Sequence, residues 1–210
     1  LGLLRIDGQG VEHWRKVHEG HGATRAVRRL RDGSLAVLAR YGLFALDEEG
    51  EILWERRLVT QGGAGDPLDL LEAGDGGFIV ASYASEGASV LVRRTDREAR
   101  VLWQRTFRPA AEAPVALAED AEGRTVLAYT TVLGGIQPTR LVGLDPGGSV
   151  LLEEDLAAAV WDMAPTRAGG LAVTGTGDGG LYLANLSPTG SGPQLPGDCN
   201  QDGAFNLSDA

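Results

Sequence analysis

An internal repeat is the feature that most restricts how this chain can fold. Each copy consists of an apolar stretch, a turn of the form Asp-x-x-Gly, and a second stretch centred on a Trp. The copies cover residues 6–17, 46–58, 94–107 and 144–156, and a fifth start at 185–190 is interrupted by Pro193. Trp14 and Trp54 are 40 residues apart, and 49 residues separate Trp54 from Trp103 and Trp103 from Leu152, which takes the Trp position. Self-similarity at such a period indicates a repeat architecture.

A second recurring pattern lies between the Trp-containing stretches. It places Asp-Gly, Glu-Gly or Gly-Gly in front of an apolar run, in residues 31–39, 75–82, 122–129 and 168–174. Asp-Gly between two apolar runs predicts a hairpin with a type I′ turn, in which both central residues need a positive φ. Each repeat therefore contains four short strands joined by tight turns, and the 31 glycines agree with so many turns.

A four-stranded unit of about 40–50 residues is typical of a β-propeller blade. Residues 79–81 and 126–128 are continuously apolar, which predicts inner strands buried between neighbouring blades. The Trp-containing strands alternate with charges, which predicts outer strands with one wet face and the Trp packed between blades. A β-sandwich also has regularly spaced strands, but it does not normally repeat one turn and one Trp at this period. The predicted fold class is all-β, a β-propeller.

About four blades are expected within residues 1–186. Residues 24–58, 67–107 and 115–156 give three complete units, residues 1–17 give two outer strands, and residues 158–186 give three inner strands. The outer strand at 11–17 could complete the last blade and close a ring of four. A fragment of a larger propeller is the equal alternative, because the chain starts without Met in what reads as the middle of a strand.

Charge and hydropathy exclude several classes of function. The formal net charge is -10, whereas a nucleic-acid-binding surface needs a basic stripe to meet phosphates. No run of about 18 apolar residues is present, so no membrane-spanning helix is expected. The start of the chain has no signal-peptide pattern. Cys199 is the single cysteine, which excludes a disulfide within these residues.

The C-terminal end differs in character from the repeats. Residues 187–197 are rich in Pro, Gly and Ser, as in a linker. In the following segment, 198–210, with Asp198 as position 1, oxygen-bearing side chains fall at positions 1, 3, 5, 9 and 12, Gly203 stands at position 6, and position 7 offers a carbonyl. A hard cation takes six to eight oxygen ligands. A polar Asx turn is the alternative, but it does not explain oxygens at positions 9 and 12 with Phe205 at position 8. The predicted Ca²⁺ ligands are Asp198, Asn200, Asp202, Ala204, Asn206 and Asp209.

This segment resembles the first calcium-binding repeat of type I dockerins. The resemblance rests on residues 197–210, and Asp209 departs from the Glu that ends an ordinary EF-hand loop. It implies the side-chain ligands above, and a cohesin-like partner recognised through Leu207 and Ser208. The helix and second loop of a dockerin are absent from this sequence. We therefore expect a truncated dockerin-like loop that binds calcium poorly by itself and does not bind a cohesin.

The repeats themselves also resemble known families. Residues 43–54 look like the repeat of PQQ-like propellers, and residues 76–107 are similar to propeller repeats of large secreted bacterial proteins. These motifs are structural, so the resemblance implies the fold more than any chemistry. A quinoprotein-like dehydrogenase would also need a cofactor-lined central face, which the sequence does not identify.

Three other patterns could carry chemistry, but each has a simpler structural interpretation. His18 and His21, with Glu19 between them and His13 nearby, could hold a metal, although a solvated loop is the simpler interpretation. The glycines of residues 175–180 predict a turn between strands, because no helix pattern or Lys follows them. Glu153, Glu154 and Asp155 are interpreted as surface charges on an outer strand, although paired acids also serve glycoside hydrolysis. No catalytic residue is assigned.

The sequence thus favours a secreted or cell-surface interaction protein without a catalytic site. Its propeller would be a binding platform for a ligand that the sequence does not name, and its dockerin-like segment would anchor it in a calcium-dependent way. The alternative is the propeller and dockerin portion of an extracellular enzyme that degrades polysaccharide.

Overall fold

The structure is a computed structural model, and it describes residues 1–58, 64–84, 89–108, 115–120, 122–131, 138–156, 158–166, 170–177 and 180–186. All regular elements in these residues are β-strands, which confirms the all-β prediction. The strands are β1 Gly2–Ile6, β2 Glu12–Val17, β3 Thr24–Arg29, β4 Leu35–Ala39, β5 Gly42–Leu46, β6 Ile52–Arg56, β7 Ala64–Glu72, β8 Phe78–Ala84, β9 Val90–Thr95, β10 Val101–Phe107, β11 Val115–Glu119, β12 Thr125–Thr130, β13 Thr139–Leu144, β14 Val150–Leu156, β15 Ala159–Pro165, β16 Leu171–Gly177 and β17 Gly180–Leu186.

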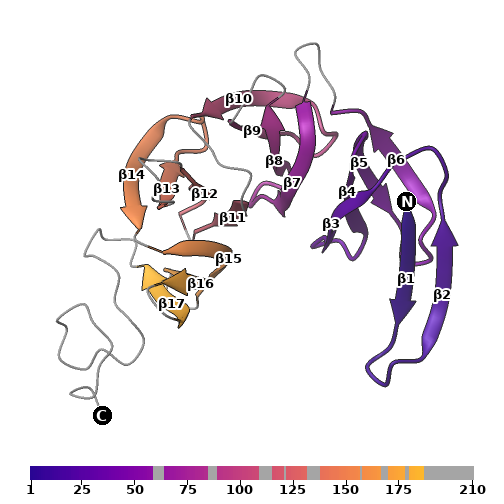
Figure 1. The fold of residues 1–210 in the computed structure, drawn as a ribbon. Helices are drawn as coiled ribbons and strands as arrows, with labels where there is room; N and C mark the ends of the chain where they lie inside the picture. Colours follow the sequence, from indigo (N-terminus) through magenta and orange to yellow (C-terminus); the bar gives the residue numbers. More distant parts are fainter. Residues whose placement is uncertain are drawn as a thin grey trace. The chain divides into compact units, whose positions relative to one another are not determined.

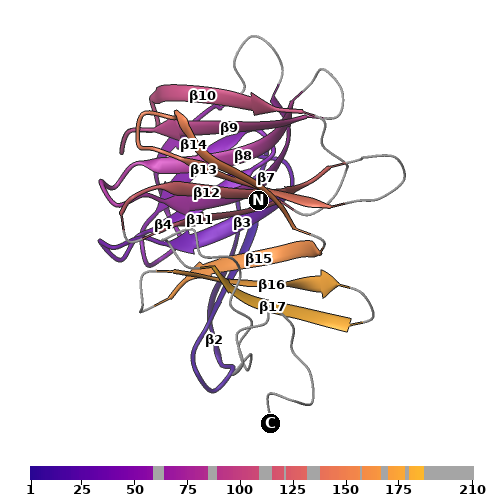
Figure 2. The same cartoon turned by 90° about the vertical axis from the view of Figure 1, so that its left-hand side faces the viewer.

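The strands form sheets from consecutive segments of the chain (Figure 1). Three sheets have four strands each, β3–β6, β7–β10 and β11–β14, and they coincide with the three complete units that the repeat predicts. Within the described residues, β1 and β2 form a two-stranded sheet and β15–β17 a three-stranded one. Figure 2 shows β15, β16 and β17 side by side in that order. In each four-stranded sheet the strands lie side by side in the order in which they follow one another in the chain, as in a propeller blade.

The chain divides into two compact units. Unit 1 consists of Leu1–Gly87 and Leu91–Gln104, and unit 2 consists of Ala88–Val90 and Arg105–Ala210. Unit 1 holds the β1–β2 hairpin, the blade β3–β6 and most of the blade β7–β10. Unit 2 holds the blade β11–β14 and the sheet β15–β17.

The Asp-x-x-Gly turns close through bonds that stay within five residues. In the turn after β5, the Asp47 N–H donates to the Glu51 carbonyl (3.0 Å) and the Gly50 N–H to the Asp47 carbonyl (3.1 Å). The Asp47 carboxylate accepts the Glu51 N–H at 2.8 Å. The same backbone bonds recur in the turns that begin at Asp7, Asp96 and Asp145, and in the turn at Asp96 the glycine position is taken by Ala99, with φ +58°. The repeated shape of the turn therefore depends on the Asp at its first position, whose carboxylate accepts the backbone N–H of the residue four positions later.

The turns between the first and second strands differ from the predicted type I′. In the turn after β3, the Gly33 N–H donates to the Leu30 carbonyl (3.0 Å) and the Leu30 N–H to the Ser34 carbonyl (2.8 Å). Gly33 has φ +92°, whereas Asp32 does not have a positive φ. The type I′ prediction is wrong here, because a five-residue turn needs a left-handed residue only at its fourth position. The Asp side chain contributes instead by accepting the N–H of the residue two positions on, as Asp75 does from Gly77 (2.9 Å).

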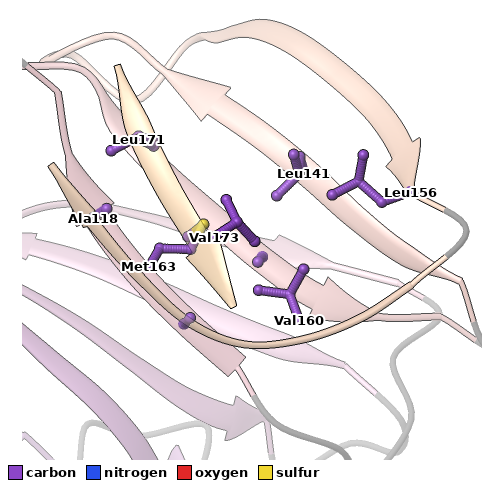
Figure 3. Close-up of a cluster of buried hydrophobic side chains, with 9 residues drawn as sticks. Ala118, Leu141, Leu156, Val160, Met163, Leu171 and Val173 are labelled. Atoms are coloured by element: carbon purple, nitrogen blue, oxygen red, sulfur yellow. The ribbon is translucent and has the colours of Figure 1, made fainter. Parts of the chain in front are cut away.

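The hydrophobic cores lie between sheets. In unit 1, Leu38, Leu43 and Phe78 belong to one buried cluster, against which Trp54 packs. In unit 2, a cluster lies between the blade β11–β14 and the sheet β15–β17, with Leu141, Val160, Met163 and Val173 pointing towards one another (Figure 3). The predicted apolar run 79–81 of β8 is buried, and in the run 126–128 of β12 Leu127 and Ala128 are buried whereas Val126 is partly buried.

Trp14 and Trp54 of the repeat lie in the gaps between sheets, as predicted, whereas Leu152, which takes the Trp position in the fourth copy, is exposed. The Trp54 ring meets Phe78 of the next blade edge to face, with ring centroids 5.9 Å apart. The Trp14 indole lies against Gly50 of the next turn, and its Nε1–H donates to the Glu48 carbonyl at 3.0 Å. No helix among the described residues is long and apolar enough to cross a membrane.

Candidate functional site

The predicted calcium ligands lie outside the residues that the structure describes, as does the 187–197 linker. The calcium site at Asp198, Asn200, Asp202, Ala204, Asn206 and Asp209 therefore stays a prediction. In the described part of the chain, no three His, Cys, Asp or Glu side chains gather in a way that could hold a metal ion.

Two of the three histidines, His18 and His21, lie in the contact between the hairpin and the first blade. His18 Nε2 lies 3.0 Å from the Gly50 carbonyl, and the His21 ring meets the buried Phe44 edge to face at 4.7 Å. His13 lies on β2 rather than in a loop, 3.7 Å from the Asp7 carboxylate. The interpretation of these residues as a solvated loop was therefore incomplete, because His18 and His21 help to cover the apolar face of the blade.

The two other patterns behave as their structural interpretations predicted. Gly177 pairs with Gly180 across a hairpin between β16 and β17, so the glycine run joins two strands. The acids of β14 are exposed, and Asp155 forms a two-bond ion pair with Arg140 on β13, at 2.8 and 3.0 Å. This ion pair holds the pKa of the Asp155 carboxyl below its usual range.

A groove of about 580 Å³ in unit 1 is the described feature best suited to hold a ligand. It runs between the blades β3–β6 and β7–β10, and it is bounded by the turns at residues 30–34, 72–76 and 97–98. Trp54 and Phe78 supply its aromatic surface. Trp54 is only partly buried, and Ala45 of β5 is the residue paired with it.

Two arginines of the groove bind backbone carbonyls of the neighbouring turns. Arg31 reaches from the first blade to the second, where its Nη1 donates to the carbonyls of Ala73 (3.3 Å) and Gly74 (2.7 Å). Arg56 Nε donates to the Glu98 carbonyl at 3.1 Å. These guanidinium groups are therefore fixed in place, and they fasten the turns of one blade to the other.

The carboxylates of the groove are also committed to structural bonds. Glu72 accepts the backbone N–H of Arg31 at 3.0 Å. The Ser34 hydroxyl donates to Asp32 at 2.5 Å and lowers the pKa of that carboxyl. Glu98 lies 3.5 Å from Arg100.

Asp75 is held by the buried guanidinium of Arg94, at 2.7 Å. Burial alone would raise the pKa of Asp75, but the Gly77 N–H and the Arg94 charge outweigh it and the pKa is lowered. Asp32, Glu72 and Asp75 thus accept hydrogen bonds within the protein, and Glu98 lies beside a positive charge.

Arg97 is the exception among the charged side chains of the groove. It is the second residue of the turn after β9, and its guanidinium makes no hydrogen bond or ion pair with any residue that the structure describes. An uncommitted guanidinium in the same groove as a partly exposed indole can donate several hydrogen bonds to a ligand. The repeat identified Trp54, but it gave no signal for Arg97, because the residue at the second turn position differs in every copy.

Comparison with known proteins supports the fold. No family model matches the sequence, and no curated protein matches it. A protein of unknown function from Bacteroides caccae is 17% identical, with a TM-score of 0.62, over 88% of this chain and 64% of its own. Virginiamycin B lyase from Staphylococcus aureus is 12% identical, with a TM-score of 0.63, over 89% of this chain and 59% of its own. A putative TolB from Agrobacterium tumefaciens is 13% identical, with a TM-score of 0.59, over 88% and 64%.

These similar structures are β-propeller-like proteins, which confirms the predicted fold class at the level of architecture. The identities are too low to transfer an activity. The chain spans 59–64% of the length of these three structures. The dockerin-like and PQQ-like resemblances have no support from these comparisons and remain predictions.

Proposed function

We propose that this chain is a non-catalytic interaction protein of the cell exterior, in which propeller blades form a rigid binding platform and the 198–209 loop is a calcium-dependent anchor. The platform is the groove of unit 1. The observation that favours binding over catalysis is the state of its ionisable groups. Each carboxylate, and two of the three arginines, already holds a backbone group or another charge. A general acid or base needs a proton that it can exchange with a substrate, and groups committed in this way are poorly placed to do so.

The groove nevertheless offers a surface that a ligand can use. The partly exposed Trp54 supplies an apolar face, and Arg97 supplies hydrogen-bond donors. Because Arg31 and Arg56 fasten the turns around them, both side chains stand on a frame that need not reorganise on binding. Preorganisation of this kind lowers the entropic cost of association.

The anchoring part of the proposal rests on the sequence of the loop. Five side-chain oxygens and one carbonyl at dockerin-like positions favour a Ca²⁺ ion, and a complete dockerin would bind a cohesin-like partner. Calcium ligation is tested by titrating the ¹⁵N-labelled chain 1–210 with CaCl₂ and following amide chemical shifts. We expect saturable shifts confined to residues 198–209 in the millimolar range, little change in circular dichroism, and loss of the shifts in Asp202→Ala. Gln201→Ala, which removes a side chain between two ligand positions, is the matched control and should titrate like the wild type. Shifts absent at 20 mM CaCl₂ would refute the calcium site.

The non-catalytic part has a separate test. The alternative, a portion of a polysaccharide-degrading enzyme, predicts that the chain releases reducing ends from a soluble plant or algal polysaccharide. The chain 1–210 is incubated with xylan, laminarin and alginate, and reducing ends are measured against time. We expect no release above the rate without protein. Release that scales with protein concentration, and that disappears in a variant of a groove residue such as Glu72→Gln, would establish the alternative instead.

A further inference from the structure

Trp14 and Trp54 hold the same position in consecutive copies of the repeat, but only Trp14 is bonded to the turn that follows it. The Trp14 Nε1–H donates to the carbonyl of Glu48, the second residue of the turn after β5, at 3.0 Å. The equivalent acceptor for Trp54 is the carbonyl of Arg97, the second residue of the turn after β9. The Trp54 Nε1–H makes no hydrogen bond with any residue that the structure describes.

The fourth residue of each turn accounts for this difference. A Cβ at Gly50 would lie 2.8 Å from Cη2 of Trp14, so an indole in that position leaves no room for a methyl group. The turn after β9 has Ala99 in place of this glycine, with φ +58°. Ala99 belongs to the buried cluster against which Trp54 packs. Its methyl group therefore excludes the position that Trp14 takes on its own turn, and Trp54 meets Phe78 edge to face instead.

The same turn brings Arg97 to the groove that Trp54 lines. Trp54 and Arg56 are two residues apart on β6, so their side chains lie on one face of that strand. Arg56 Nε donates to the carbonyl of Glu98, the residue next to Arg97, at 3.1 Å. Trp54 and Arg97 both line the unit 1 groove of about 580 Å³. The groove therefore holds an indole N–H and a guanidinium that are both free to bind a ligand.

The unused hydrogen-bonding groups of the groove indicate the chemistry of that ligand. Arg31 and Arg56 already donate to backbone carbonyls of the neighbouring turns, so those acceptors are occupied. What remains at Arg97 and Trp54 is donors, which call for a ligand rich in acceptors. A guanidinium binds a carboxylate through two parallel bonds. The partly exposed indole face calls for a flat apolar surface beside that carboxylate.

We propose that the unit 1 groove binds an acidic oligosaccharide made of uronate residues. Arg97 takes a carboxylate, the Trp54 indole stacks on the apolar face of a pyranose ring, and its Nε1–H bonds to a ring hydroxyl or to the carboxylate. Ala99 is the residue that keeps this site open, because it holds the indole off the turn. The proposal rests on the binding role given to this groove under Proposed function, and it adds the class of ligand.

The probe is a trisaccharide of β-1,4-linked mannuronate, added to the ¹⁵N-labelled chain 1–210. The indole N–H signals are followed by NMR, and that of Trp54 is identified by its loss in Trp54→Phe. We expect a saturable shift of this signal. β-1,4-Mannotriose has the same rings and linkage but a hydroxymethyl group in place of each carboxylate, and triglutamate has three side-chain carboxylates without rings. Both should bind at least about tenfold more weakly, because each lacks one of the two interactions.

Three variants of the chain test the role of each residue. Arg97→Ala should weaken trimannuronate binding at least about tenfold and leave mannotriose binding unchanged. Arg29→Ala removes an exposed arginine of unit 1 that does not line this groove, so it is the matched control and should bind like the wild type. Ala99→Gly should admit the Trp54 indole to the turn. Exchange of the Trp54 indole N–H should then slow in the free chain, and trimannuronate binding should weaken at least about fivefold.

The possible failures separate the ligand class from the proposed function. The uronate site is overturned if trimannuronate at about 10 mM does not shift the Trp54 signal, or if Arg97→Ala binds it as the wild type does. Equal or tighter binding of mannotriose or triglutamate also overturns the ligand class, but it leaves the groove as a binding platform. Release of reducing ends from bound trimannuronate would instead refute the non-catalytic function and leave the uronate site in place.

Discussion

Replacing Gly50 with Ala tests whether the contact between Trp14 and the next turn is as close as the structure shows. Gly50 has φ +79°, a conformation that costs a residue with a Cβ about 1 kcal/mol. A Cβ at this position would lie 2.8 Å from Cη2 of Trp14 and 3.0–3.1 Å from two further ring carbons. The indole cannot easily retreat, because its Nε1–H is bonded to the Glu48 carbonyl at 3.0 Å. Overpacking of this kind costs about 1–3 kcal/mol, so the total loss should be about 2–4 kcal/mol.

Gly10 provides a matched control in the preceding turn. It occupies the same turn position with φ +84°, but a Cβ there would meet nothing within 4 Å. Gly10→Ala should therefore cost only about 1 kcal/mol, the conformational part alone. The two variants thus separate the strain of the backbone from the collision with the indole.

The free energy of unfolding is measured in urea by circular dichroism, for each variant with and without Trp14→Leu. In the Trp14→Leu background the cost of Gly50→Ala should fall to about 1 kcal/mol, because the collision is removed. The hairpin can also escape the collision by leaving the blade, so the penalty cannot exceed the free energy of that docking. Equal losses for Gly10→Ala and Gly50→Ala, or a loss for Gly50→Ala that does not depend on Trp14, would refute the reasoning.

Variants at three further positions test other contacts by the same unfolding measurement. Ala99 has φ +58° and belongs to the buried cluster against which Trp54 packs. Ala99→Gly should relieve backbone strain but lose a methyl contact, so its stability should stay within about 0.5 kcal/mol of wild type. Ala99→Val should lose more than about 2 kcal/mol. Asp75→Asn should cost about 1–3 kcal/mol, because Arg94 loses its charged partner. The pKa of Asp75 is lowered in the folded protein, so the difference in unfolding free energy between wild type and variant should be present above the unfolded pKa of about 3.9. It should shrink as the pH falls through the folded pKa. A difference unchanged at low pH would contradict the ion pair. Met163→Ala should lower the free energy of unfolding by about 2–4 kcal/mol, because Met163 lies in the core of unit 2, whereas Met163→Leu should lower it by less than about 1.5 kcal/mol. Similar losses for the two variants would show that Met163 is not packed as in Figure 3.

The sequence predicts most of the fold because the repeat determines local structure several times over. The Asp residues at 7, 47, 96 and 145 each recur with the same spacing to an apolar strand, so strand positions and blade units could be read directly. The turn type could not, because Asp-Gly fits both a type I′ turn and a five-residue turn. What separates them is the number of residues between paired strand positions, such as Arg29 and Leu35, which is fixed only when the register is known.

The groove of unit 1 was beyond prediction for a different reason. Its character depends on which charges are already paired, and the contacts that pair the arginines join residues about forty positions apart, such as Arg31 with Gly74. Repeat analysis finds what the copies share, whereas these contacts use the residues in which the copies differ. Arg97 therefore stood out only when the neighbouring charges were seen to be paired.

The turn that closes on itself has a consequence for how unit 1 gains and loses structure. Its bonds fix a strand pair without help from distant residues, so each sheet can form as its own segment emerges from the unfolded chain. Links between sheets then run from one to the next, from Trp14 to Glu48 and from Arg56 to Glu98. In such a molecule each sheet is stabilised mainly by its immediate neighbours, so the loss of one sheet destabilises the adjacent sheets more than distant ones. Native-state hydrogen exchange should then reveal opening sheet by sheet along unit 1, beginning at the two-stranded hairpin.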